Sequence, residues 1–386
     1  MDRISIDQFK STKLHSGFNS SILTIELLDK PFAEGACGKV YKCSVNNINQ
    51  AVKIFTTTEK KGYETICKLQ DAVIAYNQRL KTENKKQVEE INALWALPLF
   101  SFKGKLKGTD VVGYSSHLLD DKRWINFDEL FSETTLQQRR IELQKYFYGL
   151  PFELRMKLIC DLLEGFVAFQ EMKFVYADLN PKNFFINIRD RKLCLIDYDS
   201  GGVNEEPETI GKNDDWQAPE IINKERTTAN LFTDYWSIAI TIHYFFFPFQ
   251  PFFYWKGQSK KLMEEYFKKY KYPAVNTKES NFNTDMEKKY SIYVESLKNI
   301  PPDIFRAFIQ SFQNGYFANG ARLTSRQWLK LIEPFVSNKN VSPTKPVINN
   351  SGKSISFQEK KYCNQCRKPY YKPTSNFCSY CRHKRN

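Results

Sequence analysis

The sequence predicts an α+β protein in which a small β-rich N-terminal lobe precedes a mainly helical C-terminal lobe and a small cysteine module. Residues 22–56 predict strands that a glycine-containing turn interrupts. Beyond residue 215 the apolar residues recur with helical spacing as far as Phe335. Four cysteines gather at the end of the chain, after a polar stretch that contains Pro, Asn, Ser and Gly.

Length and composition agree with more than one domain. The chain has 386 residues, 41% of them hydrophobic and 15% aromatic, which is ample for a buried core and excludes a disordered protein. We expect an N-terminal lobe at 1–120, a C-terminal lobe at 121–336, a flexible linker at 337–358 and the cysteine module at 359–386.

The positive charge is concentrated at the end of the chain. The net charge is +14, and residues 359–386 contribute half of it, with eight Lys and Arg against one acidic residue. A basic tail attracts phosphates, nucleic acid or acidic protein surfaces, and a solubilising tail is the alternative.

The N-terminal lobe is expected to combine strands with one long helix. The strands at 22–56 lead into a helical pattern at 62–95. Two strand-like runs follow, at 97–105 and 111–119. The apolar face of the helix carries Ile66, Leu69, Val73, Ile74 and Tyr76.

The C-terminal lobe is expected to begin with a polar stretch and a strong amphipathic helix at 151–172. Short strands at 184–188 and 192–196 then flank a turn. The rest of this lobe is mainly helical.

No segment predicts a membrane span or a secretory leader. The stretch 236–255 is long enough to span, but His243, Gln250 and two prolines interrupt it. We interpret it as a buried helix followed by an aromatic loop. Residues 1–10 lack the apolar run of a signal peptide. We therefore expect a cytoplasmic protein with reduced thiols and no membrane partner.

Two features of the first lobe point to phosphate binding. Gly35 and Gly38 lie in a turn between strands, where glycine lets backbone amides approach phosphate oxygens. Lys53 follows within an apolar strand, fifteen residues after Gly38, and can reach the same phosphates. Taken singly, a glycine turn is common and a strand lysine usually keeps its charge in solvent.

Three polar residues in the second lobe are more specific. Asp178 and Asn183 lie five residues apart after the long helix, and Asp197 ends an apolar strand fourteen residues later. Phosphoryl transfer needs a carboxylate to orient and deprotonate the acceptor hydroxyl, and an amide and a second carboxylate to hold magnesium. A single such residue is often only a turn residue, but that explanation is poor for three at these spacings.

The whole set resembles the eukaryotic-type serine/threonine protein kinase family over about residues 20–335. Three later matches strengthen the resemblance. Residues 216–220 resemble the motif that closes the activation segment, and 234–237 resemble the start of the central buried helix of the large lobe. Arg322 resembles the late arginine that pairs with the glutamate of the closing motif, here Glu220. The resemblance implies a bilobal protein-kinase-like fold and the use of ATP and Mg²⁺.

The resemblance also implies a role for each site residue. Asp178 and Lys53 are the expected catalytic residues, and Asn183 and Asp197 the expected magnesium ligands. Glu64 is expected to pair with Lys53, with Glu83 and Glu89 as rivals. The full ATP-binding set comprises Gly35, Gly38, Val40, Ala51, Lys53 and Glu64.

The sequence departs from the family pattern at several positions. Tyr176-Ala177 stand where the family has His-Arg, so we do not expect an arginine that reads a phosphate on the activation segment. Asn180 replaces a lysine, and Asp199 replaces the glycine that follows the metal-binding acid. Catalysis is still expected, because Lys53, Asp178, Asn183 and Asp197 are all present.

The terminal cysteines predict a zinc ribbon. Cys363, Cys366, Cys378 and Cys381 form two Cys-x-x-Cys pairs, and four thiolates at this spacing can surround a Zn²⁺ ion tetrahedrally. Disulfides are the alternative and fit a cytoplasmic chain poorly. The basic, tyrosine-rich ribbon is suited to nucleic acid or to a protein partner, and the sequence does not choose between them.

Four features together are similar to a bacterial subgroup of the family: Asp178-Leu179-Asn180-Pro181, Asp197-Tyr198-Asp199-Ser200, the Gln250-Pro251-Phe252 turn and the terminal cysteine ribbon. Some members are encoded beside phosphatase and stress-resistance genes, so the expected partners are a protein substrate and a cognate phosphatase or stress-response protein. Two other functions remain open. A small-molecule kinase of the choline or aminoglycoside type shares the Asp…Asn and Ile-Asp-Tyr pattern but generally lacks the closing motif. A pseudokinase scaffold is the non-enzymatic alternative.

Overall fold

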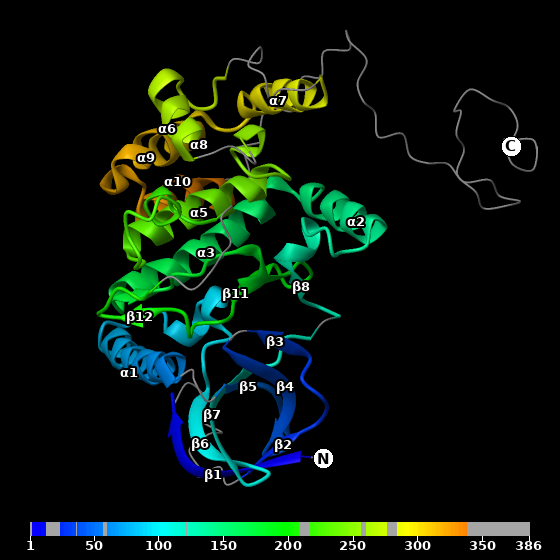
Figure 1. The fold of residues 1–386 in the computed structure, drawn as a ribbon, viewed down its shortest axis with the longest axis vertical. Coiled ribbons are helices and arrows are strands. Elements are labelled where there is room, and N and C mark those ends of the chain that lie inside the picture. Colours follow the sequence, from blue (N-terminus) through cyan, green and yellow to red (C-terminus); the bar gives the residue numbers. More distant parts are fainter. Residues whose placement is uncertain are drawn as a thin grey trace, which may run out of the picture. The chain divides into compact units, whose positions relative to one another are not determined.

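The structure is a computed structural model that describes residues 2–12, 24–35, 37–56, 60–120, 122–208, 216–255, 260–275 and 284–337 (Figure 1). The chain divides into one compact unit, Met1–Pro343, and a second unit, Thr344–Asn386. The second unit lies outside the described residues, as do the predicted zinc ligands Cys363, Cys366, Cys378 and Cys381.

A seven-stranded antiparallel sheet forms the N-terminal lobe, in the order β2-β1-β6-β7-β5-β4-β3. Because β2 pairs with β4 as well as with β1, the sheet closes on itself into the rounded form at the bottom of Figure 1. Inward side chains such as Ile4, Val52 and Phe102 fill it. The strands are β1 (Asp2–Ser11), β2 (Thr24–Leu27), β3 (Ala33–Gly35), β4 (Gly38–Val45), β5 (Ile48–Phe55), β6 (Phe100–Leu106) and β7 (Thr109–His117).

Strand β1 is an addition to the predicted elements, because the sequence predicted strands only from residue 22. Ile4 is buried and Ile6 and Phe9 pack against the core of the lobe, but a β-bulge between Ile6 and Gln8 breaks the period-2 alternation that marks a half-buried strand. Backbone pairing holds it in the sheet, with Ile4 opposite Ile25 on β2 and opposite Leu106 on β6. Because β2 and β6 lie far from β1 in the chain, their pairing with β1 leaves no pattern in the sequence of β1 itself.

The long helix of this lobe, α1 (Lys60–Thr82), is shorter than the sequence predicted. Its buried face carries Ile66, Leu69, Val73, Tyr76 and Leu80. Asn84 adopts a left-handed conformation, with φ of 51°, and the N–H of Lys85 donates to the carbonyl of Leu80. This arrangement caps the helix. Residues 83–95 continue as turns and two short 3₁₀ segments, η2 (Val88–Glu90) and η3 (Asn92–Leu94).

The C-terminal lobe is mainly helical, as predicted, and its central helices are α3 (Phe152–Glu171) and α5 (Leu231–Phe246). α10 (Ser325–Ser337) packs along α3. The other helices are α2 (Gln137–Tyr148), α4 (Pro219–Ile222), α6 (Lys260–Lys269), α7 (Thr284–Leu297), α8 (Pro302–Ile309) and α9 (Gly315–Phe317), with a π-helical turn at Gln310–Asn314.

Two small sheets complete this lobe. One has the order β11-β10-β8 and comprises β8 (Ile125–Asn126), β10 (Phe184–Asn187) and β11 (Lys192–Leu195). The other pairs β9 (Phe174–Val175) with β12 (Gly202–Val203). The first of these sheets includes both strands that the sequence predicted around residue 190.

α5 is the buried helix that the sequence predicted in place of a membrane span. Asn230 caps it, because its side chain accepts from the N–H groups of Phe232 and Thr233. The aromatic loop after it packs inward, with Phe252 stacked on Trp236. Among the described residues, no helix is long and apolar enough to cross a bilayer.

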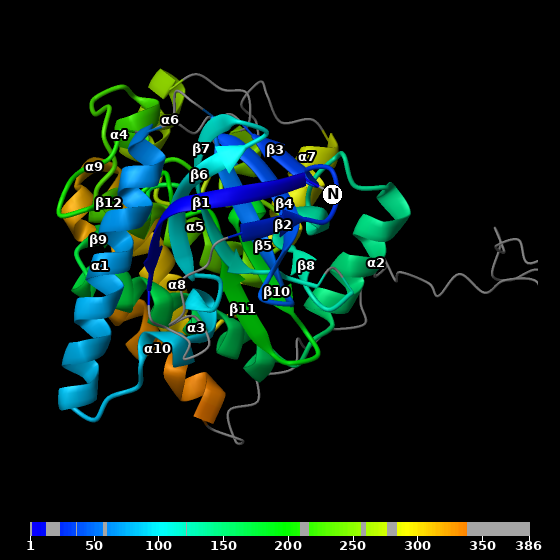
Figure 2. The same ribbon diagram turned by 90° about the horizontal axis from the view of Figure 1, so that it is seen from below.

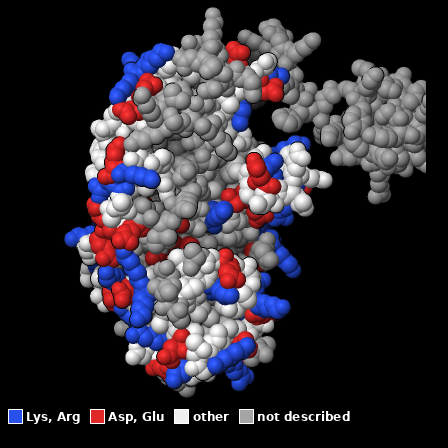
Figure 3. All heavy atoms as spheres, viewed as in Figure 1, with Lys and Arg blue, Asp and Glu red and all other residues white. Residues whose placement is uncertain are grey.

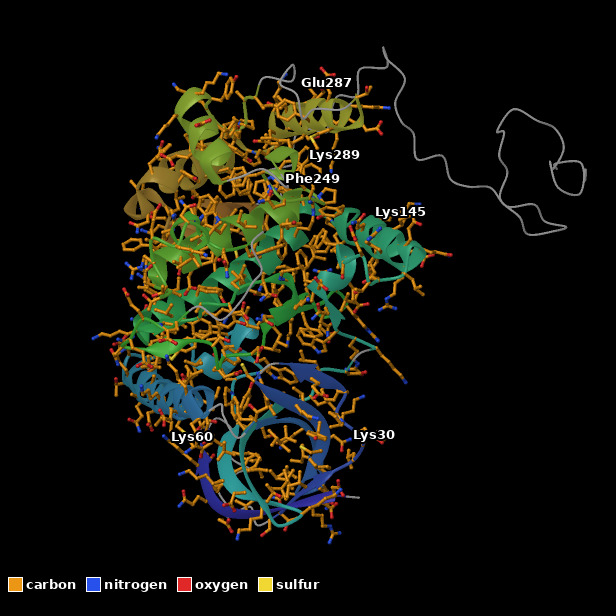
Figure 4. All side chains as sticks on the ribbon, viewed as in Figure 1. Lys30, Lys60, Lys145, Phe249, Glu287 and Lys289 are labelled. Carbon is orange, nitrogen blue, oxygen red and sulfur yellow. The ribbon has the colours of Figure 1, made fainter. Side chains whose placement is uncertain are left out.

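Aromatic rings dominate the part of the core beyond α5. Lys289 of α7 lies over two of these rings, with its Nζ 4.9 Å from the centroid of Phe249 and 4.5 Å from that of Phe253 (Figure 4). The methylene chain of Lys289 thus covers apolar surface, and its ammonium group lies over the ring faces.

α1 connects the two lobes. It contacts β5, β6 and β7 of the closed sheet and β12 of the C-terminal lobe, and Figure 2 shows it alongside the sheet. The N-terminal part of α1, the end of β5 and the segment that follows β11 meet in one region, where Gly62 lies against Phe55 and Asp199.

Candidate active site

Lys53 lies at the centre of this region, on β5. Its Nζ donates to Asp197 and, at 2.8 and 3.0 Å, to the two carboxylate oxygens of Asp199. The Lys53 side chain is only 11% exposed. Burial alone would lower its pKa, but the two carboxylates together raise the pKa above its ordinary value. Lys53 therefore stays protonated.

The strand geometry gathers other predicted residues around Lys53. Val40 of β4 lies directly opposite Lys53, and Ala51 precedes it by two residues, so all three side chains share one face of the sheet. Gly38 is tightly placed, because an added Cβ would collide with the Ile54 carbonyl. Gly35 has no atom within 4 Å of such a Cβ, so the turn leaves open space there.

Asp178 is held by two amides. The Nδ2 atoms of Asn180 and Asn183 donate to its carboxylate at 2.8 and 2.9 Å. Burial raises the pKa of Asp178, with a further contribution from the charge of Asp197, while the two amides oppose the shift. Asn180, which the sequence marked only as a departure, is therefore a direct partner of Asp178. It also caps the short helix Pro181–Asn183.

The backbone before Asp178 is anchored by a buried carboxylate. Asp234 of α5 accepts from the N–H groups of Tyr176 and Ala177, both at 2.9 Å. Burial raises the pKa of Asp234 to about 7, against the effect of these two donors. Ala177 has a φ of 68°, a conformation that non-glycine residues adopt rarely and that surrounding contacts must maintain. The anchor thus fixes the loop that presents Asp178.

Asp197 and Asp199 differ in exposure. The Asp197 side chain is 33% exposed and that of Asp199 2%. Desolvation disfavours ionisation of Asp197, yet Lys53 holds its pKa below the ordinary value. Burial, together with the charge of Asp197, raises the pKa of Asp199 to about 7.

The donor set fits a magnesium ion. Asp197 offers carboxylate oxygens beside Lys53, and Asn183 uses its nitrogen on Asp178, which leaves its oxygen as the ligand atom. Mg²⁺ prefers oxygen ligands and is usually held by one or two protein groups together with substrate phosphates. In the part of the chain that the structure describes, no group of three or more His, Cys, Asp or Glu forms a metal site.

Glu64 does not take the place predicted for it. Its side chain is exposed on α1, whereas Lys53 is buried against Asp197 and Asp199. The rival Glu83 pairs with Lys85 at 2.5 Å instead, and the side chain of Glu89 lies outside the described residues. The helix meets the site through Gly62, which has no side chain to pair. The signal that could have indicated Asp199 was its spacing, two residues after Asp197.

The closing motif and its predicted arginine partner meet in the C-terminal lobe. Arg322 donates from both terminal nitrogens to the two oxygens of Glu220, at 2.7 and 2.6 Å. Trp216 stacks on Tyr244, and its Nε1 donates to Thr241 of α5. A cavity of about 30 Å³ lies between the closing motif and the Asp178 loop, lined by residues that include Asp178, Asn180, Trp216 and Ser237.

The family model described as the protein kinase domain matches residues 29–335, which is most of the chain and includes every site residue described above. Among curated proteins, none matches the chain.

Proposed function

Because the chain belongs to the protein kinase family, we propose that it transfers the terminal phosphoryl group of ATP, with Mg²⁺, to serine or threonine hydroxyls of a protein. One observation carries this proposal. The proposed site residues come from three segments of the chain: Lys53 from β5, Asp178 and Asn183 from the loop after β9, and Asp197 from the segment after β11. Lys53 contacts Asp197, Asn183 contacts Asp178, and the charges of Asp197 and Lys53 act on the Asp178 carboxyl.

Each residue has a task in this reaction. Asp178 accepts the proton of the acceptor hydroxyl, and Asn180 and Asn183 hold its carboxylate in position. Lys53 is kept charged and binds the phosphates. Asp197 and Asn183 hold magnesium, which, when bound, neutralises charge on the phosphates. Gly35, Gly38, Val40 and Ala51 form the surface over which the nucleotide lies.

The surface around the small cavity beside Asp178 is the proposed place for a protein acceptor, since the cavity itself, at about 30 Å³, has room for about one water molecule. It lies between the catalytic loop and Trp216, Gln217 and Ala218, the residues that begin the closing motif. The buried Glu220–Arg322 pair fixes that motif to the large lobe. A hydroxyl on an extended segment could thus reach Asp178 along a supported surface.

A small-molecule kinase is the second candidate, favoured by the acid at position 199. The closing motif and its buried ion pair count against it, because small-molecule kinases generally lack them. The carboxylates and amides assembled around Lys53 and Asp178 likewise count against a pseudokinase scaffold.

The predicted ribbon extends the proposal to partners. We propose that Cys363, Cys366, Cys378 and Cys381, outside the described residues, bind Zn²⁺ and recruit the substrate, a cognate phosphatase or stress-response protein, or nucleic acid. The protein is proposed to act in the cytoplasm.

The test is transfer of radiolabelled phosphate from ATP. Purified full-length chain is incubated with Mg²⁺ and a general protein acceptor, or with choline or an aminoglycoside, and the labelled product is identified. Label on phosphoserine or phosphothreonine, lost in Asp178→Asn, supports the proposal. Label on a small molecule alone would favour the second candidate, and no transfer in any arm would favour the scaffold.

A further inference from the structure

We propose that Asp199 is the residue that positions Lys53, in place of a carboxylate supplied by α1. The proposal rests on the proposed function, because it assigns Lys53 to the phosphates of ATP. Both oxygens of Asp199 accept from the Lys53 Nζ, at 2.8 and 3.0 Å, so the contact fixes the position of the ammonium nitrogen and balances its charge.

The two acids that contact Lys53 are not equivalent. With its side chain 33% exposed, Asp197 is open to an incoming metal–nucleotide complex. Asp199 is 2% exposed and lies behind Lys53, out of reach of solvent. Asp197 can leave Lys53 to bind magnesium, whereas Asp199 remains with the lysine as a buried counter-charge. A buried ammonium without such a partner would be strongly disfavoured.

Helix α1 is built around Asp199. A Cβ added to Gly62 would lie 3.3 Å from the Asp199 Cβ and 3.4 Å from its Oδ2, and 2.9 Å from the ring of Phe55. The helix therefore approaches Asp199 with bare backbone, at the point where a side chain would otherwise compete for the space. One turn later, the hydroxyl of Thr65 donates to the carbonyl of Gly201 at 3.2 Å. The segment that carries Asp199 is thus attached directly to α1.

The partner of Lys53 is therefore carried by the segment after β11 and not by α1. In this chain one three-residue segment, Asp197–Tyr198–Asp199, supplies both the magnesium ligand and the anchor of the lysine. Tyr198 fixes that segment, because it is fully buried and its hydroxyl donates to the Leu195 carbonyl at 2.8 Å. Glu64 and the exposed face of α1 have no part in holding Lys53.

The first experiment compares Asp199→Asn with the control Glu64→Gln. Both exchange a carboxylate for an amide of the same shape, and only the first removes a partner of Lys53. We expect Asp199→Asn to lower kcat/KM for ATP by about 10- to 100-fold, the range for groups that orient a ligand without touching the substrate. Glu64→Gln should stay within about 2-fold. An unchanged Asp199→Asn, or an equal loss in Glu64→Gln, would overturn the proposal.

A double-mutant cycle separates positioning from a structural or metal-binding role. ATP affinity is measured by equilibrium binding in wild type, Asp199→Asn, Lys53→Ala and the double variant, at low and at saturating Mg²⁺. If Asp199 acts through Lys53, its replacement causes no further loss once Lys53 is absent. An additive loss, or a loss that saturating Mg²⁺ abolishes, contradicts the proposal. Because binding is read directly, the cycle remains decisive even if the wild type transfers no phosphate, which would overturn only the proposed function.

Discussion

Glu220 and Arg322 lie 102 residues apart in the sequence and form a bidentate ion pair inside the C-terminal lobe. The Arg322 side chain is 0% exposed and that of Glu220 9%. Arg322 also donates to the carbonyls of Phe232 and Gly315, so it joins the closing motif, the start of α5 and α9.

Removing one partner of this pair should destabilise the protein strongly. Glu220→Ala leaves the Arg322 charge buried without its counter-ion, and we expect a loss of about 3–5 kcal/mol in the free energy of unfolding. Urea denaturation measures it. The matched control is Asp303→Ala, which breaks the exposed Arg306–Asp303 pair and should cost less than about 1 kcal/mol. Equal losses in the two variants would show that burial does not govern the strength of the Glu220–Arg322 pair.

Replacing the proposed base should separate binding from turnover. Asp178→Ala removes the carboxylate but not Lys53 or Asp197, so ATP–Mg²⁺ binding should persist while turnover falls by about 10²- to 10⁴-fold. Asp197→Ala removes a magnesium ligand instead, so this variant should lose Mg²⁺-supported nucleotide binding. Titration calorimetry and phosphate transfer measure the two effects. Full activity in Asp178→Ala would refute its assignment.

His243 should make the stability of the protein sensitive to acid. It is fully buried in α5, where its Nε2 lies 2.8 Å from the Tyr293 hydroxyl, and burial lowers its pKa to about 3. An unfolded histidine titrates near pH 6.5, so between about pH 6.5 and 3 the unfolded state binds the extra proton and stability falls as the pH falls.

The expected slope from His243 is about 1.4 kcal/mol per pH unit in the middle of this range. His243→Gln removes the titration but retains a polar side chain toward Tyr293. Urea denaturation of both proteins between pH 7 and 5 should therefore show a shallower decline for the variant. Parallel curves would mean that His243 is not the group that takes up the proton.

Activity should not depend on a phosphate in the activation segment. Ion pairs already hold the described part of this segment: Lys68 with Glu205 at 3.0 Å, Lys61 with Glu208 at 3.7 Å, and Arg226 with Glu206. Figure 3 shows basic and acidic side chains intermixed along the left edge of the molecule, the side on which Figure 1 places α1 and β12. Added phosphate would meet the glutamates as like charges.

The test uses Thr209, which lies outside the described residues. Thr209→Ala and phosphatase-treated wild type should both keep activity within about 2-fold of the untreated protein. A large loss in both would reveal a phosphate switch that some other basic residue, such as Lys182, reads.

Zinc removal should leave the kinase site intact. Cys363→Ser should abolish the roughly one zinc per chain expected for a four-cysteine site, without changing ATP affinity, because the predicted linker separates the two modules. Elemental analysis and nucleotide binding measure the two properties. A zinc-free wild type would contradict the predicted ribbon.

The sequence by itself determined the order of the elements and the identity of most of the site. Hydrophobic periodicity located α3, α5 and most strands, because burial of one face imposes a local spacing. The spacing of Asp178, Asn183 and Asp197, read with Lys53, identified the proposed phosphoryl-transfer set. The ion pair between Glu220 and Arg322 also followed from sequence, through resemblance.

Only the tertiary structure decided which groups touch. The bulge in strand β1 obscures its apolar alternation, so only its pairing with β2 and β6 identifies it, and the end of α1 depends on the backbone conformation of Asn84. The partner of Lys53 was predicted on α1, yet the two acids that reach it lie 144 and 146 residues away. That choice depends on how closely α1 packs at Gly62, which no residue spacing encodes, because packing distance is set by all the side chains between two elements.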